Sequence, residues 1–179
     1  HTHGRAAGVR ALGRFSGSRV HEAHKALLIA FEQDESSIKV AALNVLPEIA
    51  VRKSDELFDW LSVLLDDDDA QVRMAASQCL ALTAPVFPSA VETILANELR
   101  SSSKPRQTAA WRGLKSLCET WPEVVVHHID TLLLEDDPAL RRKAAGLLKS
   151  VVARGGPSVW DLISWSLNDN DVEVRRISA

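Results

Sequence analysis

The sequence predicts an all-α fold, a right-handed α-solenoid of about six stacked helical hairpins. The first observation is a pattern that returns every 34 residues along the 179-residue chain. Repeats of this length are typical of helical hairpins that bury their apolar sides against their neighbours. The second observation is that Ala and Leu carry most of the apolar content, while aromatic residues make up only 5%. This composition favours close-packed helices over strands.

The second helix of each unit, helix B, is predicted by an anchor residue that we take as position zero of the repeat. The anchors are Gly4, Ile38, Val72, Arg106, Leu140 and Val174. Small residues occupy position +4 and leucines occupy position +8, as Ala76 and Leu80 do after Val72. A spacing of four residues places these side chains on one face of a helix. We therefore expect one helix B after each anchor.

The first helix of each unit, helix A, is predicted by a second set of apolar residues with the same period. This set includes Leu61, Leu95 and Ile129, followed four residues later by Leu65, Leu99 and Leu133. Pro88 and Pro122 fall where helices A should begin, a position where a missing N–H costs little. Acidic runs such as Asp66–Asp69 fill the turns between the two helices, where they can cap helix B.

Residues 1–179 are expected to form a single repeat domain with two unfinished ends. The first unit has no helix A before Gly4, and the last stops at Ala179, within its helix B. Solenoids need capping units with polar outer faces. We therefore expect a fragment of a longer array, or an incompletely capped array whose ends self-associate.

The turn and the start of helix B resemble those of the HEAT repeat. Asp69–Leu80 and Asp137–Leu148 both read Asp-x-x-apolar-Arg-x-x-Ala-x-x-x-Leu. The short unit is most similar to the phycobilisome-lyase-like HEAT subfamily, and the resemblance covers essentially the whole chain. It implies an α-α superhelix of the armadillo/HEAT type. Tetratricopeptide repeats share the period, but their signature Tyr is missing because the chain contains no Tyr.

The resemblance also implies a ladder of ion pairs between the acid at position −3 and the cation at position +1. The expected ladder residues are Asp69, Arg73, Asp137, Arg141, Asp171 and Arg175. Ser103 and Gln107 replace both partners in one unit. Because an isolated buried charge is costly, joint loss is what a real pair should show. We expect the ladder to be interrupted at that unit.

In this fold family, helix B lines the concave surface, which makes its outward residues the candidate binding surface. They are Asn44, Gln78, Arg112, Lys115, Arg142 and Lys149. The helix B segments hold 14 basic and 2 acidic residues, although the net charge of the chain is −3. One interpretation is a groove for an acidic protein segment or a nucleic-acid backbone. The alternative is that ladder arginines and helix dipoles explain the basic layer.

The pattern favours a non-enzymatic scaffold that binds a protein partner. A less favoured alternative is a nucleic-acid-binding protein similar to the HEAT-like DNA-repair glycosylases, with Trp111 beside the basic residues. A phycobilin-lyase-like accessory protein is a third. No catalytic, cofactor-binding or metal-ligating residue is expected, since the exposed stripe of helix B carries no acid and His21 and His24 lack a third ligand.

The remaining observations concern location and the aromatic residues. No apolar run approaches the roughly 18–20 residues that span a bilayer, so no membrane partner is expected. Cys79 and Cys118 fall at apolar helix positions, which favours buried free thiols and a cytoplasmic location. Trp60, Trp160 and Trp165 lie on predicted A helices, where we expect them to pack in the core or between units.

Overall fold

The computed structural model describes residues 7–9, 20–49, 55–153 and 156–179, and the anchor Gly4 lies outside them. These residues form helices and turns, with no strand among them. The chain divides into two compact units, His1–Gly113 and Leu114–Ala179. Each unit is described by itself.

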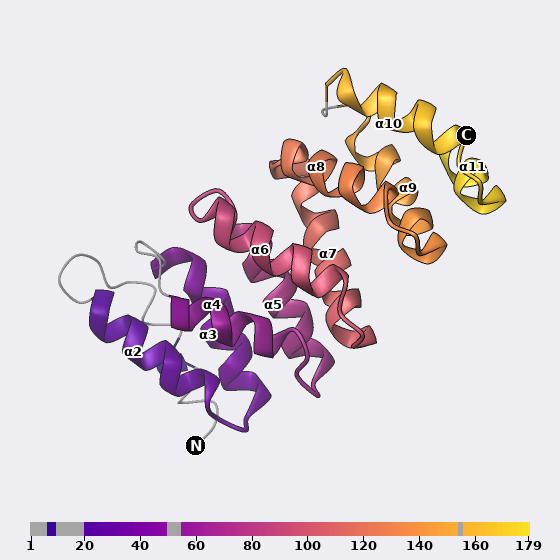
Figure 1. Cartoon of the computed structure of the whole chain (residues 1–179). Helices are drawn as coiled ribbons and strands as arrows, with labels where there is room; N and C mark the ends of the chain where they lie inside the picture. The colour runs from indigo at the N-terminus through magenta and orange to yellow at the C-terminus, as the bar shows by residue number, and fades with distance from the viewer. Residues whose placement is uncertain (1–6, 10–19, 50–54, 154–155) are drawn as a thin grey trace. The chain divides into compact units, whose positions relative to one another are not determined.

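Unit 1 contains two layers of helices. Its helices are α2 (Val20–Phe31), α3 (Ser36–Ile49), α4 (Asp55–Leu64), α5 (Ala70–Thr83), α6 (Pro88–Leu99) and the first part of α7 (Lys104–Thr120). The A helices α2, α4 and α6 contact one another in sequence, and the B helix α3 packs on α5 (Figure 1). In successive hairpins, A helices therefore pack on A helices and B helices pack on B helices.

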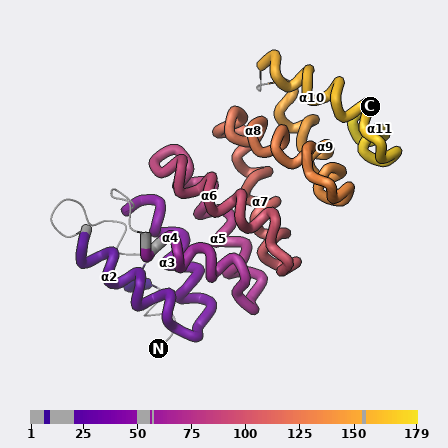
Figure 2. Tube along the Cα trace, viewed as in Figure 1, coloured from indigo at the N-terminus to yellow at the C-terminus, as the bar shows by residue number. Residues whose placement is uncertain are grey.

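Unit 2 repeats this arrangement. It contains the rest of α7, then α8 (Pro122–Leu133), α9 (Pro138–Val151), α10 (Ser158–Leu167) and α11 (Val172–Ser178). The hairpin partners are α8 with α9 and α10 with α11. The A helices α8 and α10 are in contact, as are the B helices α9 and α11. Figure 2 follows the chain through these hairpins.

The core consists of the apolar positions that the repeat predicts. The anchors Ile38, Val72, Leu140 and Val174 are at most 8% exposed. Position +4 is fully buried in four units, at Ala42, Ala76, Ala110 and Ala144, and position +8 is at most 3% exposed, at Leu46, Leu80, Leu114 and Leu148. Small side chains at +4 allow neighbouring B helices to approach closely. These positions confirm the predicted apolar face of helix B.

The helix starts also agree with the sequence. Pro88 and Pro122 are the first residues of α6 and α8, as predicted. Asp69, Asp137 and Asp171 are the N-caps of α5, α9 and α11. Their carboxylates accept hydrogen bonds from the amides of Gln71 at 2.7 Å, Ala139 at 2.8 Å, and Glu173 and Val174 at 3.0 Å. Each acid satisfies amides that have no partner within the helix.

Two further findings concern membranes and cysteines. Among the described helices, none combines the length and the apolar character needed to cross a bilayer. Cys79 and Cys118 are both free and buried, as predicted. Burial raises the pKa of the Cys79 thiol, so this group stays protonated and unreactive.

Candidate functional site

The predicted binding-surface residues are exposed in both units. In unit 1, Asn44, Gln78 and Arg112 occupy the same repeat position on α3, α5 and α7. In unit 2, Lys115, Arg142 and Lys149 are exposed on α7 and α9. Because the two units are described separately, the six residues form two sets. A common concave surface stays a prediction.

On this surface, the charge of Arg142 is matched within the chain. Its guanidinium forms a two-pronged ion pair with the Asp171 carboxylate, with Nε 3.0 Å from Oδ1 and Nη2 donating to Oδ2. The hydrogen bond from Arg142 holds the pKa of Asp171 below its usual range. Lys115 and Lys149 are therefore the better candidates for contacts with an acidic partner in unit 2.

In two pairs of neighbouring repeats, the cation at position +1 binds a different acid from the predicted one. Lys39 Nζ lies 2.7 Å from Asp67 Oδ2, and Arg141 Nε lies 2.9 Å from Asp169 Oδ2. Both cations are at position +1, but both acids are at position −5 of the next unit rather than −3. The predicted pairing with Asp69, Asp137 and Asp171 is therefore corrected: these three carboxylates cap their own helices.

The arginines at +1 also hold the turn that precedes their own helix. Arg73, Arg141 and Arg175 each use Nη1 to bind two backbone carbonyl oxygens of this turn. The acceptors are Asp67 and Asp68 for Arg73, Glu135 and Asp136 for Arg141, and Asp169 and Asn170 for Arg175, at 2.6–3.1 Å. The arginine at +1 thus joins its own turn in three units, and Arg141 also binds the next unit, as Lys39 does.

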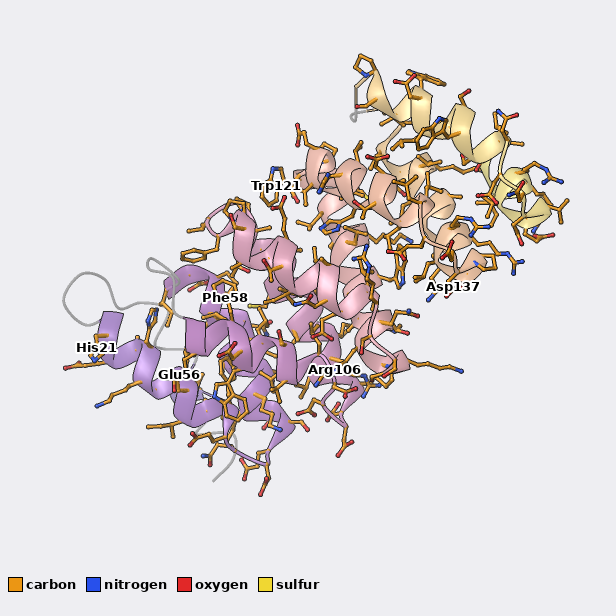
Figure 3. The ribbon with its side chains drawn as sticks, in the orientation of Figure 1. His21, Glu56, Phe58, Arg106, Trp121 and Asp137 are labelled. Atoms are coloured by element: carbon orange, nitrogen blue, oxygen red, sulfur yellow. The ribbon has the colours of Figure 1, made fainter. Side chains whose placement is uncertain are left out.

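The unit with Ser103 and Gln107 uses other groups. Ser103 Oγ donates to Asp66 Oδ1 at 2.6 Å, and Gln107 Nε2 donates to the Leu99 carbonyl at 3.0 Å. The anchor of this unit, Arg106, lies 3.0 Å from Asp66 Oδ2 and 3.6 Å from Glu98 Oε1. Figure 3 labels Arg106 near the start of α7. A polar anchor is tolerated here because these carboxylates surround its guanidinium.

A shallow hollow of about 240 Å³ lies between α5 and α7 in unit 1. It is lined by Arg73, Lys104, Pro105, Thr108, Ala109 and Arg112. Three of these side chains are cationic, and none is acidic. Such a hollow can accept a carboxylate or a phosphate oxygen.

Sequence reasoning placed Arg112 on the binding surface but missed Arg73 and Lys104 as its neighbours. A signal was present at position −5, which reads Gln33, Asp67, Ser101, Glu135 and Asp169. Ser101 occupies position −5 in the unit that follows the unit of Arg73. Reading position −5 with position +1 would have identified Arg73 as a cation without an acid in the next unit.

A second hollow, of about 360 Å³, lies on the A-helix layer between α4 and α6. Its walls include Phe58, Asp59 and Asn97, a mixture of apolar, acidic and amide groups. Nothing in this mixture selects one ligand class. The hollow between α5 and α7 is therefore the stronger candidate.

His24 and Trp111, the groups considered for other chemistry, line neither hollow. His24 Nε2 lies 3.1 Å from the Ile49 carbonyl oxygen. In the part of the chain that the structure describes, no three His, Cys, Asp or Glu residues gather closely enough to hold a metal ion. Trp111, named for the glycosylase-like alternative, is half-buried.

The tryptophans of α10 depart from the expected packing. Trp160 and Trp165 are 62% and 59% exposed, so the prediction that they pack in the core or between units is wrong for both. Trp60 is half-buried and lies near Phe31, with ring centroids 6.4 Å apart. The helical period alone does not distinguish an apolar side chain that faces a neighbour from one that faces solvent.

Repeated hairpins with a buried stripe at +4 and +8 define an α-solenoid protein of the helical-repeat class. Comparison with solved structures shows the same fold. The chain is similar to a structure of Kap95p and RanGDP, with 16% identity, a TM-score of 0.56, and coverage of 97% of this chain and 27% of that one. It is also similar to a structure from work on TOG–tubulin binding, with 17% identity, a TM-score of 0.51, and coverage of 97% and 78%.

A designed armadillo repeat protein in complex with the peptide (KR)4 also aligns, with 12% identity, a TM-score of 0.41, and coverage of 97% of this chain and 88% of that one. No protein family and no curated protein matches the sequence. The two structures with TM-scores above 0.5 show the α-solenoid fold alone.

Proposed function

We propose that this chain is a non-enzymatic scaffold that binds a segment of a protein partner along its B helices. The observation that carries the proposal is the repeated exposure of one position. Asn44, Gln78 and Arg112 are exposed at position +6, while the flanking positions +4 and +8 of the same helices are buried. Three successive units thus offer a polar side chain at the same place, an arrangement suited to an extended segment.

The proteins with the same fold support a binding role. The two structures come from work on Kap95p binding to RanGDP and on TOG–tubulin binding. Both concern binding to a protein, and we infer for this chain only that its partner is a protein. The free, buried thiols of Cys79 and Cys118 agree with a reducing, cytoplasmic location for such a scaffold.

The charge of the surface favours an acidic segment. Arg112 lines the cationic hollow with Arg73 and Lys104, and Lys115 and Lys149 are exposed in unit 2. Complementary charge speeds association and selects the partner more than it adds affinity. No described residue specifically supports the alternative of a phycobilin-lyase-like accessory protein.

The second candidate function is nucleic-acid binding, because a hollow lined by three cations suits phosphate as well as carboxylate. The two functions differ in salt dependence. Contacts to a nucleic-acid backbone release counterions, so binding should weaken steeply as salt rises. Binding of short DNA and RNA, measured by fluorescence anisotropy at low and moderate salt, separates them.

The proposal is tested by affinity capture with the full chain and two charge-reversed variants. Arg112→Glu/Lys115→Glu changes the proposed surface, whereas Lys25→Glu makes the same kind of change on an exposed position of the A helix α2. A genuine partner should be lost with the first variant and kept with the second. Equal capture by all three proteins would contradict the proposal, and salt-sensitive nucleic-acid binding lost with the first variant would favour the alternative.

A further inference from the structure

The ion pair between neighbouring repeats lacks its acid at one place in unit 1. The cations Lys39 and Arg141 each bind a carboxylate at position −5 of the next unit, at 2.7 and 2.9 Å. Arg73 stands at the same position as these cations. The residue at position −5 of the unit that follows it is Ser101.

Ser101 keeps the backbone geometry of the acids it replaces. Asp67 Oδ1 accepts a hydrogen bond from the amide two residues on at 2.9 Å, and Asp169 Oδ1 does so at 2.7 Å. Ser101 Oγ accepts the equivalent hydrogen bond from the Ser103 amide at 3.2 Å. The turn is therefore the same in all three units, and only the carboxylate that faces the preceding unit is missing.

Arg73 is held as Arg141 is, but one edge of its guanidinium has a different environment. Arg141 uses Nη1 for its own turn, and its Nε and Nη2 bind Asp169 at 2.9 and 3.2 Å. Both hydrogen bonds that the Arg73 side chain donates within the described residues come from Nη1. In the register of the repeat, the residue equivalent to Asp169, which binds the Nε–Nη2 edge of Arg141, is Ser101 for Arg73.

Two acids that act electrostatically on Arg73, Asp66 and Asp69, are engaged elsewhere. Asp66 accepts hydrogen bonds from Ser103 and Arg106, and these bonds lower its pKa. Asp69 caps α5 through the Gln71 amide, and a hydrogen bond with Ser36 is the main cause of its lowered pKa. Both carboxylates thus reduce the local positive potential without taking the place of the missing acid.

We propose that Arg73 is a carboxylate-binding subsite, in which an Asp or Glu side chain of the partner protein completes the ion pair that the repeat makes internally at Asp67 and Asp169. The carboxylate would enter the hollow between α5 and α7, where Lys104 and Arg112 add positive charge and Thr108 adds a hydroxyl. An arginine edge matches the two oxygens of a carboxylate. The identity of the ligand rests on the proposed function, but the geometry of the subsite does not.

The geometry can be tested without a partner by restoring the acid within the chain. Ser101→Asp places a carboxylate at position −5, while the matched control Ser102→Asp adds the same charge at the exposed neighbouring position. We expect Ser101→Asp to shift the Arg73 Nε–H resonance in an NMR spectrum and to raise the thermal midpoint above that of Ser102→Asp. If the two variants had equal thermal midpoints and Ser101→Asp left the Arg73 Nε–H resonance unchanged, the proposed geometry of the subsite would be wrong.

Binding can then be measured with a short acetylated and amidated peptide of alternating Asp and Ser, against the same peptide with Asn. We expect the Asp peptide to shift the Arg73 resonance in the unmodified chain and the Asn peptide to leave it unchanged. Ser101→Asp should weaken binding about tenfold, because it occupies the edge internally. Ser102→Asp should weaken it about twofold or less, an effect of net charge alone.

Three outcomes would contradict the proposal. Equal weakening by the two variants would show that only net charge matters. Binding without a shift at Arg73 would place the acidic contact elsewhere on the scaffold, leaving the proposed function standing. Tighter binding of a short single-stranded RNA, lost with Ser101→Asp, would replace the carboxylate with a phosphate and would remove support from the proposed protein partner.

Discussion

Glu98 is a charged residue inside unit 1 whose surroundings disfavour its ionised form. The residue is 6% exposed on α6, and its Oε2 has no hydrogen-bond partner among the described residues. Arg106 lies 3.6 Å from the other oxygen but is closer, at 3.0 Å, to Asp66. Burial raises the pKa of Glu98, partly offset by the charge of Arg106.

This pKa shift predicts how Glu98→Gln changes stability with pH. A raised pKa in the folded state means that ionised Glu98 destabilises the fold relative to the protonated acid, so its contribution to stability falls as pH rises through the folded pKa. Glu98→Gln should therefore unfold at higher urea concentration than the unmodified chain at pH 7. The difference should shrink below the ordinary Glu pKa of about 4.3, where this side chain is protonated in both the folded and the unfolded state. A variant less stable at pH 7 would show that the Arg106 attraction outweighs burial.

The ladder shows what residue-level reasoning can and cannot predict. The repeat correctly indicated that a cation at +1 and an acid in the turn work together. It could not select the acid, because Asp67 and Asp69 both lie in the turn and recur with the same period. The choice depends on the turn itself: Asp67 accepts the Asp69 amide and faces Lys39, while Asp69 faces the amides of α5.

At the scale of the helix, the caps of the B helices give a separate prediction. Asp137 is exposed, and its side chain accepts the Ala139 amide at 2.8 Å at the start of α9. Asp137→Ala should lower the free energy of unfolding by about 1 kcal/mol, the usual cost of losing such a cap. Asp137→Asn keeps an acceptor at the same place and should cost only a few tenths of a kcal/mol. Urea unfolding of both variants checks this, and equal losses would rule out a capping role.

The elements themselves were largely predictable because their signals are local. Acids at position −3 cap the B helices α5, α9 and α11, and Pro88 and Pro122 begin two A helices. The exposure of Trp160 and Trp165 was not predictable in the same way, because it depends on which elements lie against α10. Likewise, the cationic hollow forms only because α5 and α7 are neighbours in the fold, so a local sequence pattern could not predict it.

At the scale of the whole molecule, the repeat predicted the solenoid because every unit supplies the same buried positions. Function was less predictable for the same reason: the repeated residues are those that build the fold. Information on binding lies where a unit departs from the pattern. Ser101 is such a departure. In two other units, position −5 holds an acid, Asp67 or Asp169, that forms an ion pair with the preceding unit.

A solenoid should also lose stability locally, because each hairpin contacts its neighbours in sequence rather than a single central core. Leu80 on α5 and Leu148 on α9 occupy the same repeat position in different units and are 0% and 2% exposed. Each change to Ala should cost about 2 to 5 kcal/mol locally, through lost apolar burial and the cavity left behind.

Hydrogen exchange followed by mass spectrometry can locate the loss from each change. Leu80→Ala should speed exchange most in α5 and in the helices that contact it, α3, α4 and α6, whereas Leu148→Ala should act most on α8, α9 and α11. The two variants serve as controls for each other, since they remove the same atoms at the same repeat position. If either one accelerated exchange uniformly along the chain, the molecule would unfold as a single cooperative block, and nearest-neighbour stacking would not describe its stability.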